Sequence, residues 1–326
     1  MGMQRLYPWH LVRYSHNDMS NKKRTATKSI DKEVQPTESA RPSRYLIPIG
    51  GNEKKSPDSE IFREMVDLAG GTEARIVVVP TASEEPGERA RDYNELFSAF
   101  NPKSIQTVHI GERPDAGSAE LCRIVSETTL FMFGGGDQLR LSSLIGGTPL
   151  HRALIERYQA GGCVVAGTSA GAAFLPEMMI FQNNGFRLFR KGGIETTKGM
   201  GLIQDMIFDT HFVQRSRVSR LVHAVATNPA MLGIGIAENT GLIIQDETMA
   251  RVVGADTVIV VDGSAIEINH VGYAENRKPF ALTNVIYSIL TAGMVYDLKR
   301  RTVIDPGPIA PPKSMLPMRR THPGTS

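Results

Sequence analysis

Residues 162–171, Gly-Cys-Val-Val-Ala-Gly-Thr-Ser-Ala-Gly, begin with a short apolar run and end in small residues. The run 162–166 is typical of a buried β-strand, and the Ala-rich segment that follows is typical of a helix start. Strand, tight turn and helix in this order are the context of a G-x-S-x-G nucleophile elbow. Small neighbours allow the strained turn that exposes the hydroxyl of Ser169, and the N–H of Ala170 can then point towards a developing oxyanion. The segment therefore predicts a nucleophilic serine; the alternative is a Gly-rich turn with an incidental serine.

The same alternation continues on both sides of this segment. Short β-branched or aromatic runs are expected to be strands, and amphipathic stretches between several of them are expected to be helices. The expected strands are 45–49, 75–79, 104–109, 129–133 and 162–166, and the helices include 60–68, 88–100 and 150–160. This order predicts an α/β fold in which a mostly parallel sheet lies between two helical layers. Later strands at 241–245, 257–261 and 265–269 lack intervening helices and are expected to form an antiparallel extension.

Composition fits an ordinary globular protein. Of the 326 residues, 41% are hydrophobic and 22% are charged, which argues against a disordered or fibrous chain. No apolar run approaches the roughly 20 residues that span a bilayer, so the sequence predicts no integral membrane protein. The two cysteines, Cys122 and Cys163, cannot build a disulfide framework or a structural zinc site, and no metal-ligand spacing is present.

Charge is distributed unevenly along the chain, whose formal net charge is +3. Residues 1–44 contain nine Lys and Arg against four Asp and Glu, and residues 305–326 contain three against one. We expect a disordered basic tail over 1–44, a single catalytic α/β domain over 45–304 and a Pro-rich tail over 305–326. Because the basic surplus belongs to the tails, a nucleic-acid partner is not expected. The first residues lack the apolar core of a secretory signal, so we expect a cytoplasmic protein.

A second loop with chemical potential is Gly134-Gly135-Gly136-Asp137-Gln138, which follows the expected strand 129–133. Successive glycines let backbone amides approach a ligand, as oxyanion donors or as a phosphate cradle. The G-K-[ST] ending of a P-loop is missing, so a P-loop is excluded. A plain strand-to-helix connection is an equally good interpretation of this loop alone.

A serine nucleophile needs a histidine base and a carboxylate that orients it. Among the eight histidines, only His211 ends an apolar segment where a loop at the sheet edge is expected. Glu238 follows the strand-like run 232–237 and is the best candidate for the carboxylate; an exposed turn acid is the alternative. The resulting order Ser, His, Glu differs from the Ser, acid, His order of α/β-hydrolases, so that family is disfavoured.

Three arginines, Arg215, Arg217 and Arg220, come soon after His211. A solvated basic face is the usual interpretation of such a group, and positions i and i+2 do not share a helix face. Beside a catalytic histidine, however, guanidinium groups could bind substrate carboxylates as bidentate forks.

Four segments in combination resemble a known family. They are G-G-G-D-Q at 134–138, G-T-S-A-G-A at 167–172, D-T-H-F at 209–212 with the three arginines, and G-I-G-I-A-E-N-T at 233–240. In this order they resemble the serine peptidase family that contains the cyanophycinases and the peptidase E-type aspartyl dipeptidases. The resemblance covers residues 45 to 261, and only the histidine-arginine block is specific by itself.

The resemblance implies a fold similar to that of class I glutamine amidotransferases, with Ser169 in place of their cysteine nucleophile. It implies that His211 is the base and Glu238 the third member of a triad. It also implies a substrate pocket lined by Gln138, Asp209, Thr210, Arg215, Arg217 and Arg220. Thr210 stands where the family commonly has glutamine, and Ala237 stands where it commonly has aspartate.

We therefore predict a serine exopeptidase that hydrolyses cyanophycin, a poly-aspartate with arginine on each β-carboxyl, to β-aspartyl-arginine dipeptides. The amides of Gly135, Gly136 and Ala170 are expected to stabilise the oxyanion. The alternatives are an α-aspartyl dipeptidase with the same triad and, from a different class, a non-catalytic binding protein that retains the pocket. No cofactor or metal is expected, the polymer is the expected partner, and a homodimer would suit the family.

Overall fold

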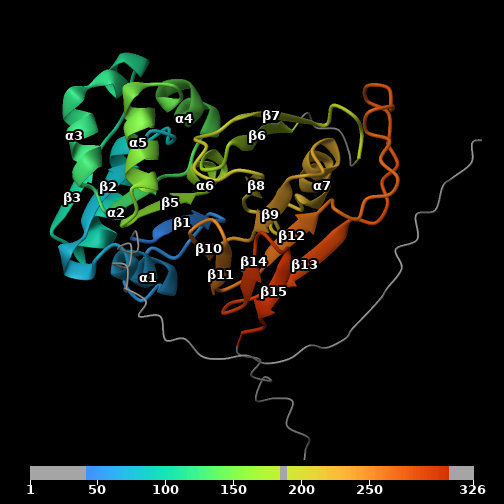
Figure 1. Ribbon diagram of the computed structural model, residues 1–326. Coiled ribbons are helices and arrows are strands. Elements are labelled where there is room, and N and C mark those ends of the chain that lie inside the picture. The colour runs from blue at the N-terminus through green and yellow to red at the C-terminus, as the bar shows by residue number, and fades with distance from the viewer. Residues whose placement is uncertain (1–41, 184–188, 308–326) are drawn as a thin grey trace, which may run out of the picture. The chain divides into compact units, whose positions relative to one another are not determined.

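The computed structural model describes residues 42–183 and 189–307, and nine strands within these ranges form one mixed sheet (Figure 1). Their order in space is β15-β14-β11-β10-β1-β5-β4-β2-β3. The strands are β1 (Arg44–Ile49), β2 (Arg75–Val79), β3 (Ser104–Thr107), β4 (Leu130–Phe133), β5 (Cys163–Thr168), β10 (Thr240–Gln245), β11 (Met249–Gly254), β14 (Val295–Asp297) and β15 (Thr302–Asp305). The run from β1 to β3 pairs in parallel, and the strands from β10 to β15 add to it antiparallel.

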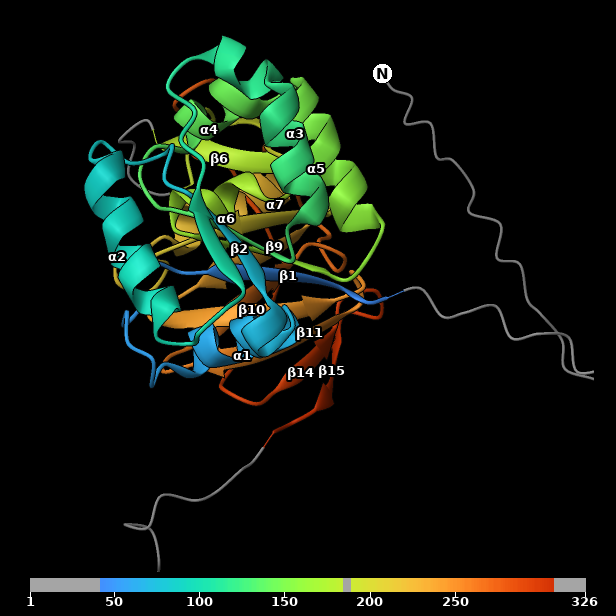
Figure 2. The ribbon, with the colours of Figure 1, turned by 90° about the vertical axis from the view of Figure 1, so that its left-hand side faces the viewer.

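Helices cover both faces of the parallel half of this sheet (Figures 1 and 2). They are α1 (Glu60–Leu68), α2 (Pro86–Ser98), α3 (Ala119–Glu127), α4 (Gln138–Ile145) and α5 (Pro149–Gln159). Neighbouring strand residues point to opposite layers: Phe131 packs in the core with α3, α4 and α5, and Met132 packs with α1 and α2. Because both faces are buried, β4 is apolar throughout rather than alternating. The three-layer arrangement follows from this two-sided burial.

The chain also forms a second sheet and a hairpin within the described residues. The second sheet has the order β13-β12-β9-β8, and β6 pairs with β7 in a two-stranded sheet. Their elements, with two more helices, are α6 (Ala170–Phe174), β6 (Met178–Asn183), β7 (Ile194–Lys198), β8 (Met206–Asp209), α7 (Val218–Thr227), β9 (Leu232–Ile236), β12 (Val258–Asp262) and β13 (Ile286–Leu290). The strand expected at 257–261 is therefore present as β12, but it belongs to the second sheet rather than to an extension of the first.

The prediction of a strand at 265–269 is wrong. In that segment only Asn269 pairs, in an isolated bridge with Leu282. Both edges of the preceding strand β12 are already occupied, by β9 and β13. Asp262 also accepts a hydrogen bond from the N–H of Ser264 (2.9 Å), which turns the chain away. Alternating residues alone do not make a strand where the preceding strand offers no free edge.

The first and last strands among the described residues lie next to the predicted domain boundaries. β1 begins at Arg44 and β15 ends at Asp305, so each end extends one residue beyond the expected domain. The remainder of the two expected tails, residues 1–41 and 308–326, lies outside the described residues. Within the described ranges, no helix combines the length and the apolar character needed to cross a bilayer.

Sheet order brings the loops of interest together. The strands β1, β5 and β4 are neighbours and run parallel, so the loops at their carboxyl ends meet at one edge. These loops comprise residues 50–55, the turn at Ser169 and residues 134–137. The second sheet joins at the same edge, because the N–H of His211 donates to the carbonyl of Gly50 (2.7 Å).

Candidate active site

Ser169 lies in the turn between β5 and α6, with φ 52° and ψ −114°. Non-glycine residues rarely adopt a positive φ, so the surrounding structure must hold this turn. The N–H of Ser169 donates to the carbonyl of Ile49 at 3.0 Å. The flanking glycines allow close packing: a Cβ on Gly171 would lie 2.3 Å from the carbonyl oxygen of Phe133, and one on Gly167 would lie 2.5 Å from Gly171. The turn therefore has the strain and the small neighbours that the sequence predicts.

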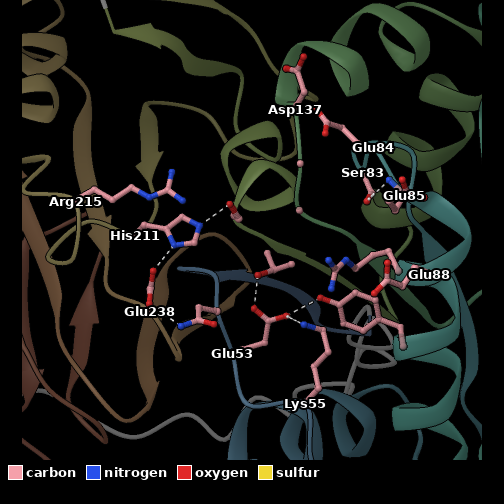
Figure 3. Close-up of a pocket in the computed structure, with 17 residues that line it drawn as sticks. Glu53, Lys55, Ser83, Glu84, Glu85, Glu88, Asp137, His211, Arg215 and Glu238 are labelled. Carbon is pink, nitrogen blue, oxygen red and sulfur yellow. Dashed lines mark hydrogen bonds and ion pairs between the residues drawn. The ribbon is translucent and has the colours of Figure 1, made fainter. Parts of the chain in front are cut away.

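Three side chains from separate loops form one hydrogen-bonded chain (Figure 3). The hydroxyl of Ser169 lies 2.8 Å from Nε2 of His211, and Nδ1 of His211 lies 2.7 Å from Oε1 of Glu238. A carboxylate can only accept, so Nδ1 carries the proton and Nε2 is left to accept from the serine hydroxyl. We call this series of three hydrogen-bonded side chains (Ser169, His211, Glu238) the open chain. Its members follow one another in the order that a serine nucleophile, a base and an orienting acid require.

The base candidate is fixed by the loop after β1. His211 itself has φ 48°, and its imidazole lies against Gly51, where a Cβ would be 2.4 Å from Cε1. Burial lowers the pKa of His211 below its ordinary value. The hydrogen bond with Glu238 opposes this by raising the pKa, and the nearby Arg215 lowers it further. The net downward shift favours a neutral imidazole, which is the form that can accept a proton.

Glu238 is held from its far side by Asn52, whose amide Nδ2 donates to Oε2 at 2.8 Å. Hydrogen bonds from His211 and Asn52 lower the pKa of Glu238 below its ordinary value. The N–H of Glu238 donates to Oε1 of Gln214 at 3.1 Å. The carboxylate is thus kept ionised and oriented towards the imidazole.

The glycine loop after β4 lies beside the serine. A Cβ on Gly135 would be 3.3 Å from Cβ of Ser169, so a larger residue would crowd the nucleophile. Gly136 has φ 143°, and a Cβ there would lie 1.9 Å from the carbonyl oxygen of Ala82. Asp137 caps α4 by accepting from the N–H of Leu139 (2.8 Å). The role of these glycines as oxyanion donors, like that of Ala170, stays a prediction.

The open chain borders a cavity of about 770 Å³. Its lining consists of Asn52, Glu53, Lys55, Ser83, Glu84, Glu85, Glu88, Arg89, Tyr93, Gly135, Gly136, Asp137, Thr168, Ser169, His211, Arg215 and Glu238. Across the cavity from the open chain lies an acidic wall (Glu84, Glu85, Glu88), formed by the loop before α2 and its first turn (Figure 3). The lining thus has exposed carboxylates on one side and Arg215 beside His211 on the other (Figure 3). Two further cations of the lining are paired with carboxylates, Lys55 with Glu53 and Arg89 with Asp92.

A buried ion cluster (Asp209, Arg217, Arg220) flanks His211 along the sequence. The side chain of Asp209 is 0% exposed; it accepts from Nε of Arg220 at 2.6 Å and from Nη1 of Arg217 at 3.4 Å. Nη1 of Arg217 also donates to the carbonyl of Thr210 at 2.7 Å. Burial, followed by the charge of Arg220, lowers the pKa of Arg217 to about 10. The cluster fixes the chain on both sides of His211.

The structure therefore divides the predicted substrate-binding residues. Arg215 lines the cavity, whereas Asp209, Thr210, Arg217 and Arg220 lie outside its lining. Gln138 also lies outside the lining: its Nε2 donates to the carbonyl of Ile180 at 3.0 Å, which ties α4 to the hairpin. Contact between these five residues and a substrate stays a prediction.

Sequence patterns missed the loop 50–55 and the acidic wall. Gly50 and Gly51 directly follow the first expected strand, and this glycine pair was the available signal. The acidic wall had the signal Glu84-Glu85-Pro86 after a strand end. Within the described ranges, no group of three or more His, Cys, Asp and Glu side chains is arranged to hold a metal ion.

Comparison with known families identifies the class of this protein as a peptidase. Residues 46–252 match Peptidase family S51, and the chain belongs to this family. The predicted resemblance and the prediction of a peptide-bond hydrolase are confirmed.

Individual relatives agree with this assignment. The chain is 33% identical over 258 residues to a cyanophycinase of Thermosynechococcus vestitus, a match that covers 79% of this chain and 80% of the relative. It is 34% identical over 254 residues to a cyanophycinase of Geminocystis herdmanii, covering 78% of this chain and 93% of the relative. The crystal structure of a peptidase from an acI-B1 Actinobacterium superposes with a TM-score of 0.60 at 22% identity, covering 79% of this chain and 98% of that chain. That likeness concerns the fold, and the predicted α/β class is confirmed.

Proposed function

We propose that this protein is a serine exopeptidase that hydrolyses cyanophycin and releases β-aspartyl-arginine dipeptides. The observation that carries the proposal is the open chain, in which Ser169, His211 and Glu238 are joined by hydrogen bonds of 2.8 and 2.7 Å at the edge of a large cavity. Neither cysteine lines that cavity, and burial raises the pKa of Cys163 to about 12, so a thiolate nucleophile is disfavoured.

In the proposed reaction, the hydroxyl oxygen of Ser169 attacks the scissile carbonyl while Nε2 of His211 takes its proton. The imidazolium formed is stabilised by Glu238, and it then donates the proton to the leaving amine. Water, deprotonated by the same imidazole, hydrolyses the acyl-enzyme. Backbone amides of Ala170 and the Gly135–Gly136 turn are proposed to bind the oxyanion, each contributing about 3–4 kcal/mol as in other serine hydrolases.

Cyanophycin suits the charges of the cavity. Each branch of the polymer has a guanidinium group and a free α-carboxylate. The acidic wall supports recognition of the guanidinium, because carboxylates accept charge-assisted hydrogen bonds from it. Arg215, beside His211, supports recognition of a carboxylate. A simple α-aspartyl dipeptide has no need of three carboxylates across the cavity, so the acidic wall favours the polymer.

The test incubates purified protein with insoluble cyanophycin and follows clearing of the suspension and release of dipeptide by chromatography. We expect β-aspartyl-arginine as the product, and we expect Ser169→Ala to lower the rate by about 10⁴-fold or more. The control is Ser126→Ala, which changes an exposed serine on α3 and should keep full activity.

Two results would contradict the proposal. Faster cleavage of Asp-X dipeptides than of cyanophycin would favour the α-aspartyl dipeptidase. Binding of cyanophycin without hydrolysis by the wild-type protein would favour the non-catalytic binding protein.

A further inference from the structure

Glu53 is a buried carboxylate in the wall of the cavity. Its side chain is only 2% exposed, and the open chain does not include it. Removing a carboxylate from water costs free energy unless hydrogen bonds or an ion pair compensate, so a buried glutamate at an active site needs a reason.

The contacts of Glu53 join three separate elements (Figure 3). Oε2 accepts from the hydroxyl of Thr168 at 2.5 Å. Oε1 accepts from the hydroxyl of Tyr93, on α2, at 2.6 Å, and it lies 3.4 Å from Nζ of Lys55. The ammonium of Lys55 also lies 5.2 Å from the centre of the Tyr93 ring. Both carboxylate oxygens are therefore occupied.

Thr168 is the last residue of β5, directly before Ser169. The turn at Ser169 has a positive φ and would relax if its flanks were free, since such backbone persists only where neighbours determine it. The backbone N–H of Ser169 is held by the carbonyl of Ile49, and the side chain of Thr168 is held by Glu53. The open chain orients the serine hydroxyl, but the hydrogen bond that Thr168 donates to Glu53 holds the residue from which the turn begins.

We propose that Glu53 is a positioning residue that holds the nucleophile elbow in its reactive geometry through the hydroxyl of Thr168. This inference rests on the proposed function, because it assumes that Ser169 is the nucleophile. Tyr93 and Lys55 hold the carboxylate itself. Burial, followed by the charge of Glu53, raises the pKa of Tyr93 well above its ordinary value, which keeps the phenol a donor to this carboxylate.

Two substitutions at Thr168 isolate the bond. Thr168→Val removes the hydroxyl with little change of shape, and Thr168→Ser keeps it. Misplacing reacting groups by about 1 Å can cost about 100-fold, so we expect Thr168→Val and Glu53→Gln each to lower kcat on cyanophycin by about 10- to 100-fold. KM should stay within about twofold, because uniform binding is not altered. Thr168→Ser should keep kcat within about threefold of the wild type, since its hydroxyl preserves the bond.

The double variant Thr168→Val/Glu53→Gln tests whether the two residues act through one bond. If they do, the double variant should be no slower than the slower single variant, because effects of residues that share an interaction are not additive. Additive losses, an unchanged kcat in Thr168→Val, or a raised KM at constant kcat would each overturn the inference. Circular dichroism checks folding, and if Glu53→Gln fails to fold, the Thr168→Val and Thr168→Ser pair tests the same bond alone.

A second measurement separates this inference from the proposed substrate. Phenylmethylsulfonyl fluoride sulfonylates a reactive serine with release of fluoride, and mass spectrometry of the whole chain gives the rate of labelling without any peptide substrate. We expect labelling at Ser169 to slow in Thr168→Val and Glu53→Gln as kcat does, and to be kept in Thr168→Ser. A wild-type protein that is labelled at Ser169 but leaves cyanophycin intact would refute cyanophycin as the substrate. The labelling rates of the variants would still test the role of Glu53. Equal labelling rates in all variants would overturn the role of Glu53.

Discussion

His211, the middle residue of the open chain, and the buried ion cluster lie only a few residues apart along the same segment, yet they differ in what surrounds them. His211 points to the cavity and contacts groups from two distant loops. Asp209, two residues earlier, is fully buried and is neutralised by Arg217 and Arg220 from its own segment. The difference teaches that closeness to a catalytic candidate in sequence does not place a charged side chain in the lining of the cavity. The nearest buried counter-charge decides where a guanidinium points.

The largest effect is expected from breaking the buried ion cluster. Asp209→Asn leaves two guanidinium groups without their buried partner, which should lower the free energy of unfolding by about 3–5 kcal/mol. Urea denaturation measures this loss. The matched control is Glu127→Gln, which breaks the exposed pair with Arg123 and should cost about 0.3–0.5 kcal/mol.

The KM of the same variant tests whether the buried ion cluster contacts substrate. In the fraction of Asp209→Asn protein that stays folded, KM for cyanophycin should be close to that of the wild type. An unchanged stability together with a raised KM would show instead that the cluster contacts substrate, as the resemblance implies.

A smaller effect is expected from Arg215, the arginine that lines the cavity. Arg215→Gln removes a charge-assisted bond to a substrate carboxylate, worth about 1.5–3 kcal/mol, so KM for cyanophycin should rise roughly tenfold or more. Arg215→Lys keeps the charge without the bidentate geometry, so its KM for cyanophycin should lie between those of the wild type and Arg215→Gln. Arg123→Gln, on the exposed face of α3, is the control. An unaffected KM in Arg215→Gln would remove this residue from the substrate site.

The smallest effect is a displacement of the pH profile. Activity should fall as pH decreases through the pKa of His211, because a protonated imidazole cannot take the proton of Ser169. Burial lowers this pKa, so the acid limb of kcat/KM should lie below the ordinary histidine value of about 6.5. Glu238 raises this pKa and Arg215 lowers it. Glu238→Gln should therefore move the limb to lower pH and Arg215→Gln to higher pH; displacements in the same direction would contradict this account.

Local pattern was sufficient for the parts of the molecule that depend on neighbours in sequence. The elbow, the five parallel strands and the helices between them follow from apolar runs, small residues and amphipathic spacing, each within about a dozen residues. Ser169, His211 and Glu238 could be selected because each stands at the end of such a run.

Long-range contacts were beyond that kind of reasoning. The bond from Asn52 to Glu238 joins residues 186 positions apart, and the bond from Thr168 to Glu53 joins residues 115 positions apart. Hydrophobic periodicity along the sequence contains no information about such distant partners. The inward direction of Arg217 and Arg220 depends on the burial of Asp209, which becomes evident only when β8 is placed beside β9 at the end of the second sheet. For the same reason the segment 265–269 resembled a strand, since occupied edges cannot be seen in a sequence.

The position of β1 has a consequence for how the chain is made. This first strand lies between β5 and β10, and the N–H of Arg44 donates to Asp246, 202 positions further along. At a synthesis rate of 5–20 residues per second, roughly 10–40 s pass on the ribosome before its second neighbour exists. During that time an apolar strand edge is exposed to other chains. The loop 50–55 also lacks its full set of contacts with His211 and Glu238. The hydrogen bonds that join Ser169, His211 and Glu238 therefore cannot all form in the nascent chain until its last third has emerged.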